Sequence, residues 1–246
     1  RQSAILSGLV GSEMCIRDRD NAQSQGVTVF EGYHVTEVIF DGDDAIGVTF
    51  TDAEGGSGEA QCRFIVDASG QSTLISRHMD TKQWDPFFQN LAVYAYFTGT
   101  KPLPEPDQNN IFIESYRYGW LWSIPLHTGR TSIGVVVDSK VGQEGIQQHG
   151  AKAFLESQLA LSCHTRGMLE DAQMDSDPNV VMDWSYTADK LYGPGYIIAG
   201  DAACFVDPLF SSGVHLALMS GVLAAAYVTT APVSYTHLTL PTNREV

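Results

Sequence analysis

Residues 195–221 combine the residue types that bind a negatively charged group. A buried strand ends at Gly200-Asp201, small residues turn the chain, and Ser211-Ser212-Gly213 opens a long apolar helix. Free backbone N–H groups and the helix dipole favour negative charge at such an opening, for example a halide ion or the anionic edge of a flavin. Asp201 can accept hydrogen bonds from the hydroxyls of a ribityl chain. An ordinary strand-to-helix junction with a helix cap is the alternative interpretation.

A second candidate site is a pair of tryptophans in the sequence WLWSIP, residues 120–125. Trp120 and Trp122 are separated by one residue on a predicted strand, so both indoles project from the same face of a sheet. A pair of half-buried aromatic side chains packed on a sheet would follow the same pattern, and this alternative stays open on the spacing alone.

Other residues that often carry chemistry lack the required spacing. His215 lies one turn into an apolar helix and is predicted to be a core histidine. Ser211 has no G-x-S-x-G sequence around it, which disfavours a hydrolase. The aspartates of residues 41–44 do not follow the calcium-loop pattern. The four cysteines form no CxxC pair, so we predict no metal site and a reducing, cytoplasmic location. They are Cys15, Cys62, Cys163 and Cys204.

The elements that position these residues are predicted from apolar periodicity. Residues 27–30, 35–40, 45–50 and 60–67 read as a β-meander. Residues 91–97, 111–116, 120–126 and 131–137 are rich in β-branched and aromatic side chains and read as one antiparallel sheet. A helix is predicted at 143–161, strands at 180–186 and 196–199, and an apolar helix at 213–228.

The two ends of the chain do not share the patterning of the middle. Residues 1–19 and 232–246 show no strand alternation or helical stripe and resemble translated read-through, so we expect them to be non-native. Three further segments follow: residues 20–80 with the meander, residues 81–180 with the antiparallel sheet and helical region, and residues 181–231 with the Gly-Asp motif and the last helix.

The composition is that of a globular protein. The chain has 246 residues, 43% of them hydrophobic, with 14 basic and 29 acidic side chains and a net charge of −15. Such a negative field repels phosphate backbones, so no nucleic-acid partner is expected. The longest apolar run is interrupted by His215 and Ser220 and is shorter than the ~20 residues that cross a bilayer, so no membrane span is expected.

Three motifs together resemble one enzyme family. The sequence GDAACFVDPLFSSGVHLA, residues 200–217, resembles the second FAD motif of flavin monooxygenases, and in particular that of flavin-dependent halogenases. Residues 67–70, DASG, resemble a motif of the same superfamily. Residues 120–125 match the WxWxIP signature of the halogenases and are the most discriminating of the three.

The resemblance implies an α/β fold, with an incomplete Rossmann-like FAD-binding domain into which an antiparallel substrate-binding sheet is inserted. It implies FAD reduced by a separate flavin reductase, and a halide co-substrate that is transferred to an electron-rich aromatic ring. Trp120 and Trp122 would form a partition between flavin and substrate, and the backbone of Ser212 and Gly213 would bind halide. The implied cofactor-binding residues are Ser69, Gly70, Asp201, Pro208, Ser211, Ser212, Gly213 and Val214.

Two departures from the family pattern narrow this interpretation. The amino-terminal GxGxxG and the catalytic lysine of halogenases have no counterpart in the chain, so we expect the chain alone to be inactive. Phe210 stands where tryptophan halogenases carry a glutamate, which favours a phenol, a pyrrole or a substrate tethered to a carrier protein over tryptophan.

Two other classes of protein remain possible from the sequence. A flavin hydroxylase or an enzyme resembling geranylgeranyl reductase would share the Gly-Asp and DASG motifs but would not require WxWxIP. A ligand-binding scaffold domain without catalytic activity would bind no flavin.

Overall fold

The computed structural model describes residues 9–182 and 185–230, which form two compact units. The first unit comprises Arg1–Val29 and Pro86–Trp184, and the second comprises Phe30–Asp85 and Ser185–Val246. Residues 1–8 and 231–246, most of the predicted read-through, lie outside the described residues, as do Asp183 and Trp184 of the strand predicted at 180–186.

The first unit is built on one antiparallel sheet in the order β10-β6-β9-β8-β7, with β11 also paired to β6. This confirms the antiparallel sheet predicted from the sequence. Its strands are β6 (Asn90–Thr98), β7 (Phe112–Tyr116), β8 (Gly119–Pro125), β9 (Thr131–Asp138), β10 (Gln173–Met174) and β11 (Asn179–Met182).

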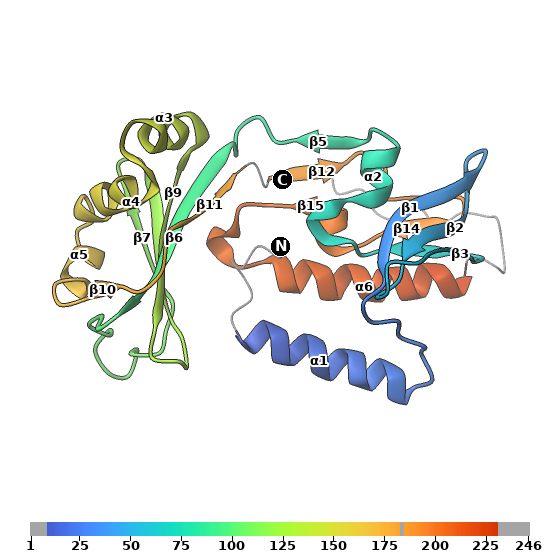
Figure 1. Ribbon diagram of the computed structural model, residues 1–246, viewed down its shortest axis with the longest axis horizontal. Helices are drawn as coiled ribbons and strands as arrows, with labels where there is room; N and C mark the ends of the chain where they lie inside the picture. The colour runs from blue at the N-terminus through green and yellow to red at the C-terminus, as the bar shows by residue number, and fades with distance from the viewer. Residues whose placement is uncertain (1–8, 183–184, 231–246) are drawn as a thin grey trace. The chain divides into compact units, whose positions relative to one another are not determined.

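Helices cover one face of this sheet (Figure 1). They are α3 (Ser139–His149), α4 (Ala151–Ala160) and α5 (Thr165–Met168). Alternate residues of β6, β8 and β9, including Val93, Leu121 and Val135, pack with Phe154 and Leu155 of α4 in a buried core. The side chains between them on these strands, among them both tryptophans, therefore project from the opposite face.

The helix predicted at residues 143–161 is two helices. Asp138 caps α3 by accepting hydrogen bonds from the N–H groups of Lys140 and Val141 at 2.9 and 3.3 Å. Gly150 then has φ of +81°, a conformation that favours glycine and ends the helix. The sequence prediction missed this break because the apolar spacing continues across it.

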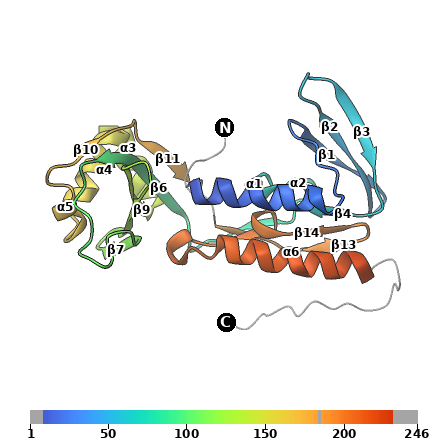
Figure 2. The same cartoon turned by 90° about the horizontal axis from the view of Figure 1, so that it is seen from below.

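The second unit contains three small sheets, and Figure 2 shows the first two of them. The first is the antiparallel meander β1 (His34–Asp41), β2 (Asp44–Thr51) and β3 (Ser57–Gln61). The second has the order β13-β14-β4, in which β14 (Tyr196–Ile198) and β4 (Ile65–Asp67) are parallel and β13 (Tyr192–Gly193) is antiparallel. The third joins β15 (Cys204–Phe205), β12 (Tyr186–Ala188) and β5 (Lys82–Trp84).

Helices and short 3-10 turns follow the strand ends of this unit. They are η1 (Gly70–Ser72), α2 (Leu74–His78), η2 (Gly200–Ala202), η3 (Pro208–Phe210) and α6 (Gly213–Thr230). Tyr227 of α6 packs against Phe64 and against Tyr192 of β13, with ring centroids 5.5 and 5.6 Å apart. Mixed helices and open sheets with a parallel pair confirm the predicted α/β class.

Three local predictions were wrong. Residues 27–30 form no strand, and Val27 and Phe30 are exposed. The strand predicted at 60–67 is divided between β3 and β4, which belong to different sheets. His215, predicted to be a core histidine, is exposed. Helix α1 (Leu9–Ser24) runs across the boundary drawn at residue 19. Helix α6 is 18 residues long with a mean hydropathy of 1.4, and 6% of it is buried, so by length and composition alone it is the one described helix that could cross a membrane.

Candidate functional site

The DASG turn follows strand β4 in the second unit. The carboxylate of Asp67 is buried and accepts hydrogen bonds from the N–H groups of Ser69 and Ile75 at 3.0 and 2.8 Å. The hydroxyl of Ser69 accepts from the N–H of Leu74 at 3.1 Å, and Gly70 has φ of +63°. Asp67 and Ser69 therefore hold the turn and the start of α2, a role that the sequence motif did not reveal.

The Gly-Asp turn follows β14 at the same edge of the sheet. Because β14 and β4 are parallel, with Ile198 opposite Asp67, their carboxyl ends place the two turns side by side. The Ala199 N–H donates to the Asp67 carbonyl at 2.9 Å, which ties the turns together. Gly200 has φ of +60°, and its N–H donates to the hydroxyl of Ser220 on α6 at 2.8 Å. The structure thus brings two of the predicted cofactor motifs together.

The side-chain carboxylate of Asp201 is not used to hold this turn together. Its backbone carbonyl accepts a hydrogen bond from the hydroxyl of Tyr186 at 2.6 Å, but its carboxylate has no hydrogen bond or ion pair within residues 9–182 and 185–230. Burial raises the pKa of Asp201 above its ordinary value. A half-buried, unpaired carboxylate is costly to the fold, so a bound group that donates hydrogen bonds would relieve that cost.

The opening of α6 lies beside this carboxylate. A Cβ on Gly213 would stand 3.9 Å from Asp201 Oδ1. Helix α6 begins at Gly213, since the Ser212 carbonyl accepts the first helical hydrogen bond from Leu216 at 3.0 Å. Ser211 has φ of +52°, a left-handed conformation that aims the chain into the helix. The first N–H groups of α6 have no intrahelical acceptor.

The remaining predicted residues form the approach to α6. Asp207 caps the turn η3 by accepting from the Leu209 N–H at 2.9 Å, with Pro208 as the first residue of that turn. Phe210 is 87% exposed and Val214 is 53% exposed. Proline at the first position of a turn is pre-set for it. The sequence indicated that Asp207 and Pro208 turn the chain here, and the structure adds that the Asp207 carboxylate caps the turn.

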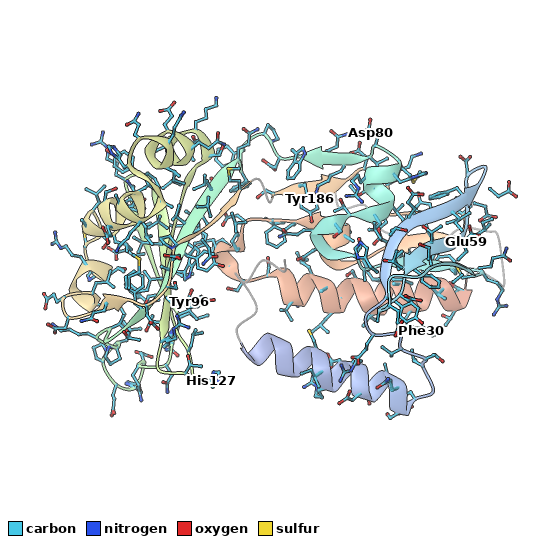
Figure 3. All side chains as sticks on the ribbon, viewed as in Figure 1. Phe30, Glu59, Asp80, Tyr96, His127 and Tyr186 are labelled. Atoms are coloured by element: carbon cyan, nitrogen blue, oxygen red, sulfur yellow. The ribbon has the colours of Figure 1, made fainter. Side chains whose placement is uncertain are left out.

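The predicted tryptophan pair lies in the first unit, on the face of the sheet opposite the helices. The indoles of Trp120 and Trp122 are 5.9 Å apart between centroids, and Trp122 lies 5.9 Å from the ring of Tyr94 on β6. The rings of Tyr94 and Tyr96 are 6.2 Å apart between centroids, and Figure 3 labels Tyr96 on this sheet. The indoles therefore belong to a continuous row of aromatic rings contributed by two strands, β8 and β6.

Trp122 is fixed more tightly than its neighbour. It is 5% exposed, and its Nε1–H donates to the Ser132 hydroxyl on β9 at 3.2 Å. Gly134 lies directly beneath the indole, because a Cβ there would come within 2.4 Å of Trp122 Cζ2 and 2.6 Å of Tyr94 Cβ. Ser132 and Gly134 were not predicted as site residues. The sequence spacing of β9 could indicate a strand but not which residue faces the indole.

The chain matches known proteins over most of its length. The sequence model of the tryptophan halogenase family matches residues 18–229. The chain is 35% identical over 212 residues to a tryptophan 2-halogenase of Chondromyces crocatus, covering 85% of this chain and 40% of that protein. It is 35% identical over 233 residues to the sulochrin halogenase of Aspergillus terreus, covering 84% and 42% of the two chains.

Solved structures give the same relationship. The myxobacterial chondrochloren halogenase, an FAD-dependent halogenase, superposes with a TM-score of 0.80 at 38% identity, covering 89% of this chain and 51% of that one. The flavin-dependent brominase Bmp2 superposes with a TM-score of 0.80 at 28% identity, covering 91% and 56%. The chain spans less than half the length of the two curated relatives.

Proposed function

The chain belongs to the tryptophan halogenase family of flavin-dependent halogenases, and we propose on this basis that it is part of a two-component FAD-dependent halogenase acting on an electron-rich aromatic compound. Family membership confirms the resemblance drawn from the three sequence motifs. Bound reduced FAD would supply, together with oxygen, the oxidising equivalents that turn halide into a halogenating species.

The second unit has the chemistry to hold the flavin end of FAD. The unpaired carboxylate of Asp201 can accept hydrogen bonds from ribityl hydroxyls, which would offset the cost of its partial burial. Gly200 lets the turn pass close to Ala217 of α6, where a Cβ would stand 3.4 Å from that methyl group. We also assign three further residues to the wall of the cofactor site. Pro208 follows Asp201 on the segment 200–217, and Ser69 and Gly70 lie on the neighbouring DASG turn.

The opening of α6 suits a negative charge. Its first N–H groups, from Ser212 to Val214, combine with the positive end of an 18-residue helix, whereas the Ser211 N–H already donates to the Pro208 carbonyl at 2.9 Å. We assign the backbone of Ser212 and Gly213 to halide and the neighbouring N–H groups to the flavin edge. The carboxylate of Asp201 repels a halide at short range, so the halide would bind on the side of the opening turned away from it.

The paired indoles are the observation that carries the halogenase assignment. Trp120 and Trp122 lie next to each other on the sheet face opposite the one that packs against α4, and Trp122 is held in place by Gly134 and Ser132. A rigid wall of this kind can separate a flavin from its substrate while a small oxidant passes, a task that a hydroxylase, whose flavin must contact the substrate, does not require.

The substrate class follows from Phe210. A phenyl ring cannot accept a proton or orient a lysine as a carboxylate can, so we propose a phenolic or pyrrolic substrate, free or tethered to a carrier protein, rather than tryptophan. A separate flavin reductase is the proposed partner. We also propose a reducing, cytoplasmic location, which the free thiols at Cys15, Cys62, Cys163 and Cys204 support.

The experiment uses the complete protein that contains this chain, purified with a flavin reductase. A panel of phenols, pyrroles and tryptophan is incubated with chloride, with bromide and without halide, and products are identified by mass. The proposal predicts a mass gain that changes with the halide and is absent without it. Hydroxylated product that does not depend on halide would favour a flavin hydroxylase, and absence of bound flavin would favour a scaffold domain.

A further inference from the structure

The Gly200-Asp201 turn is held from two sides by side chains that have no assignment in the cofactor site. On one side, the hydroxyl of Tyr186 on β12 donates to the Asp201 carbonyl at 2.6 Å. On the other side, the hydroxyl of Ser220 on α6 accepts from the Gly200 N–H at 2.8 Å. The N–H that enters this dipeptide and the carbonyl that leaves it are both anchored, so its backbone is fixed at both ends.

The Asp201 carbonyl lies where the chain leaves a helical turn. The turn η2 ends at Ala202 and β15 begins at Cys204, so the chain does not continue as a helix that would supply an N–H to this carbonyl. The hydroxyl of Tyr186 takes that place. Burial raises the pKa of Tyr186 above its ordinary value, and the nearby Asp201 adds to the rise, so the phenol stays protonated and remains a donor even in alkaline solution.

The ring of Tyr186 is itself firmly packed. Tyr186 is 4% exposed and lies on the middle strand of the sheet β15-β12-β5, and Figure 3 labels it. Its ring meets Trp84 of β5 edge-on at 5.5 Å and stacks with Phe205 of β15 at 6.5 Å between centroids. The Lys82 ammonium lies 3.7 Å from the ring centroid, a cation–π contact. These contacts involve the ring alone, so Tyr186→Phe removes the hydroxyl and keeps the packing.

Neither anchor uses the Asp201 carboxylate. Both hydrogen bonds go to the main chain, and the carboxylate has no hydrogen bond or ion pair within the part of the chain that the structure describes. A Cβ on Gly213 would stand 3.9 Å from Asp201 Oδ1, so the carboxylate lies beside the opening of α6. Since the backbone sets the direction of the Cα–Cβ bond, the two anchors determine where the carboxylate is presented.

We propose that Tyr186 and Ser220 are positioning residues, which hold the Gly200-Asp201 turn so that the Asp201 carboxylate faces the ribityl hydroxyls of FAD. This role rests on the proposed function, because it takes the flavin site as given. A carboxylate that is already oriented binds more tightly, since less freedom is lost when the ligand arrives. The competing explanation is that the two hydroxyls only tie β12 and α6 to the turn as ordinary fold contacts.

The test is a double-mutant cycle on FAD binding by the complete protein, measured by titration calorimetry. Tyr186→Phe should weaken FAD binding about three- to ten-fold, the loss expected for one neutral hydrogen bond. Ser220→Ala should give a loss of the same order. In an Asp201→Ala background, each of the two changes should weaken FAD binding by less than about two-fold, because no carboxylate remains to be oriented.

Thermal unfolding separates positioning from an ordinary fold contact. Asp201→Ala keeps the backbone carbonyl that Tyr186 contacts, so the stability changes of Tyr186→Phe and Asp201→Ala should add although their effects on FAD binding do not. Tyr116→Phe is the matched control, because it removes a hydroxyl that donates to Gln158 in the first unit at 2.9 Å. It should cost a similar amount of stability and leave FAD binding unchanged.

Wild-type FAD affinity in a folded Tyr186→Phe protein would overturn the proposal. So would losses of FAD affinity that are equal with and without the Asp201 carboxylate, since the hydroxyl would then be an ordinary fold contact. If Tyr186→Phe does not fold by circular dichroism, Ser220→Ala carries the same cycle at the other anchor, and an unchanged affinity there counts against the positioning role. A wild-type complete protein that binds no FAD would overturn the proposed function and this role with it, whereas the other results overturn the role alone.

Discussion

Gly134→Ala is the sharpest perturbation that the structure offers for the tryptophan wall. The new Cβ would lie 2.4 Å from Trp122 Cζ2, 2.5 Å from Cη2 and 2.6 Å from Tyr94 Cβ. Carbon atoms in contact normally lie about 3.5–4.0 Å apart, so the indole must move by roughly 1 Å. Neither the indole nor the tyrosine can swing out to solvent, because Trp122 is 5% exposed and Tyr94 is 2% exposed.

The expected cost follows from overpacking. Adding a methyl group to a filled site typically costs about 1–3 kcal/mol. In a chain of this size, each kcal/mol lowers the unfolding temperature by about 2–4 °C. This movement of the indole also strains the hydrogen bond from Trp122 Nε1–H to the Ser132 hydroxyl, which is already 3.2 Å long. In the complete enzyme, a displaced Trp122 should lower the yield of halogenated product per flavin oxidised.

The assay combines thermal unfolding with near-ultraviolet circular dichroism, which reports the environment of the indole. Gly167→Ala is the matched control, because a Cβ at Gly167 would meet no atom within 4 Å and its φ is not positive. A double variant with Trp122→Phe removes the two clashing atoms and should recover most of the stability lost in Gly134→Ala, relative to Trp122→Phe alone.

A Gly134→Ala chain that unfolds at the wild-type temperature with an unchanged aromatic spectrum would refute the reasoning. So would a double variant in which the two losses simply add, since additivity would mean that residue 134 and the indole do not meet.

Asp201→Asn should raise the unfolding temperature at pH 7 while weakening FAD binding by the complete protein by about 10- to 100-fold. The stability gain follows from the pKa of Asp201, which burial raises in the folded chain. The charged carboxylate therefore destabilises the folded chain above that pKa, and the neutral asparagine amide removes this cost. Glu114→Gln should destabilise the first unit by about 1.5–3 kcal/mol in denaturant unfolding at pH 7, because the Glu114 carboxylate accepts hydrogen bonds from the N–H groups of Cys163, His164 and Thr165. Burial alone would raise the pKa of Glu114, but these bonds lower it overall, so its stabilisation is present above the unfolded pKa of about 4.3 and is lost as the pH falls through the folded value. The variant should therefore lose less stability than the wild type on acidification.

The sheet of the first unit was predictable because its strands combine β-branched and aromatic runs with clear turn residues between them. The same logic failed where tertiary structure overrides local pattern. Residues 60–67 read as one strand, but the chain leaves the meander after Gln61 and re-enters a different sheet at Ile65. Nothing in the alternation marks that change of partner. Val27 and Phe30 have strand propensity but no neighbouring strand to pair with.

The candidate site shows a similar division. Spacing placed Trp120 and Trp122 on one face, and the Gly-Asp turn at the opening of a helix, because both follow from local periodicity. Gly134 and Asp67 could not be found in this way. Gly134 matters through an indole 12 residues away on the neighbouring strand. The DASG motif suggested a cofactor role, whereas Asp67 and Ser69 also hold the turn through hydrogen bonds that only the folded chain reveals.

The most direct test of the halogenase account is the ratio of halogenated product to reduced FAD oxidised, measured with the complete protein and its Trp120→Leu variant. Tyr118→Leu, at an exposed aromatic residue beside β8, serves as the control. If the indoles form the wall between flavin and substrate, Trp120→Leu keeps flavin oxidation, releases peroxide and loses most of the halogenated product, while Tyr118→Leu retains the wild-type ratio. A folded Trp120→Leu protein that halogenates with the wild-type ratio would contradict the account.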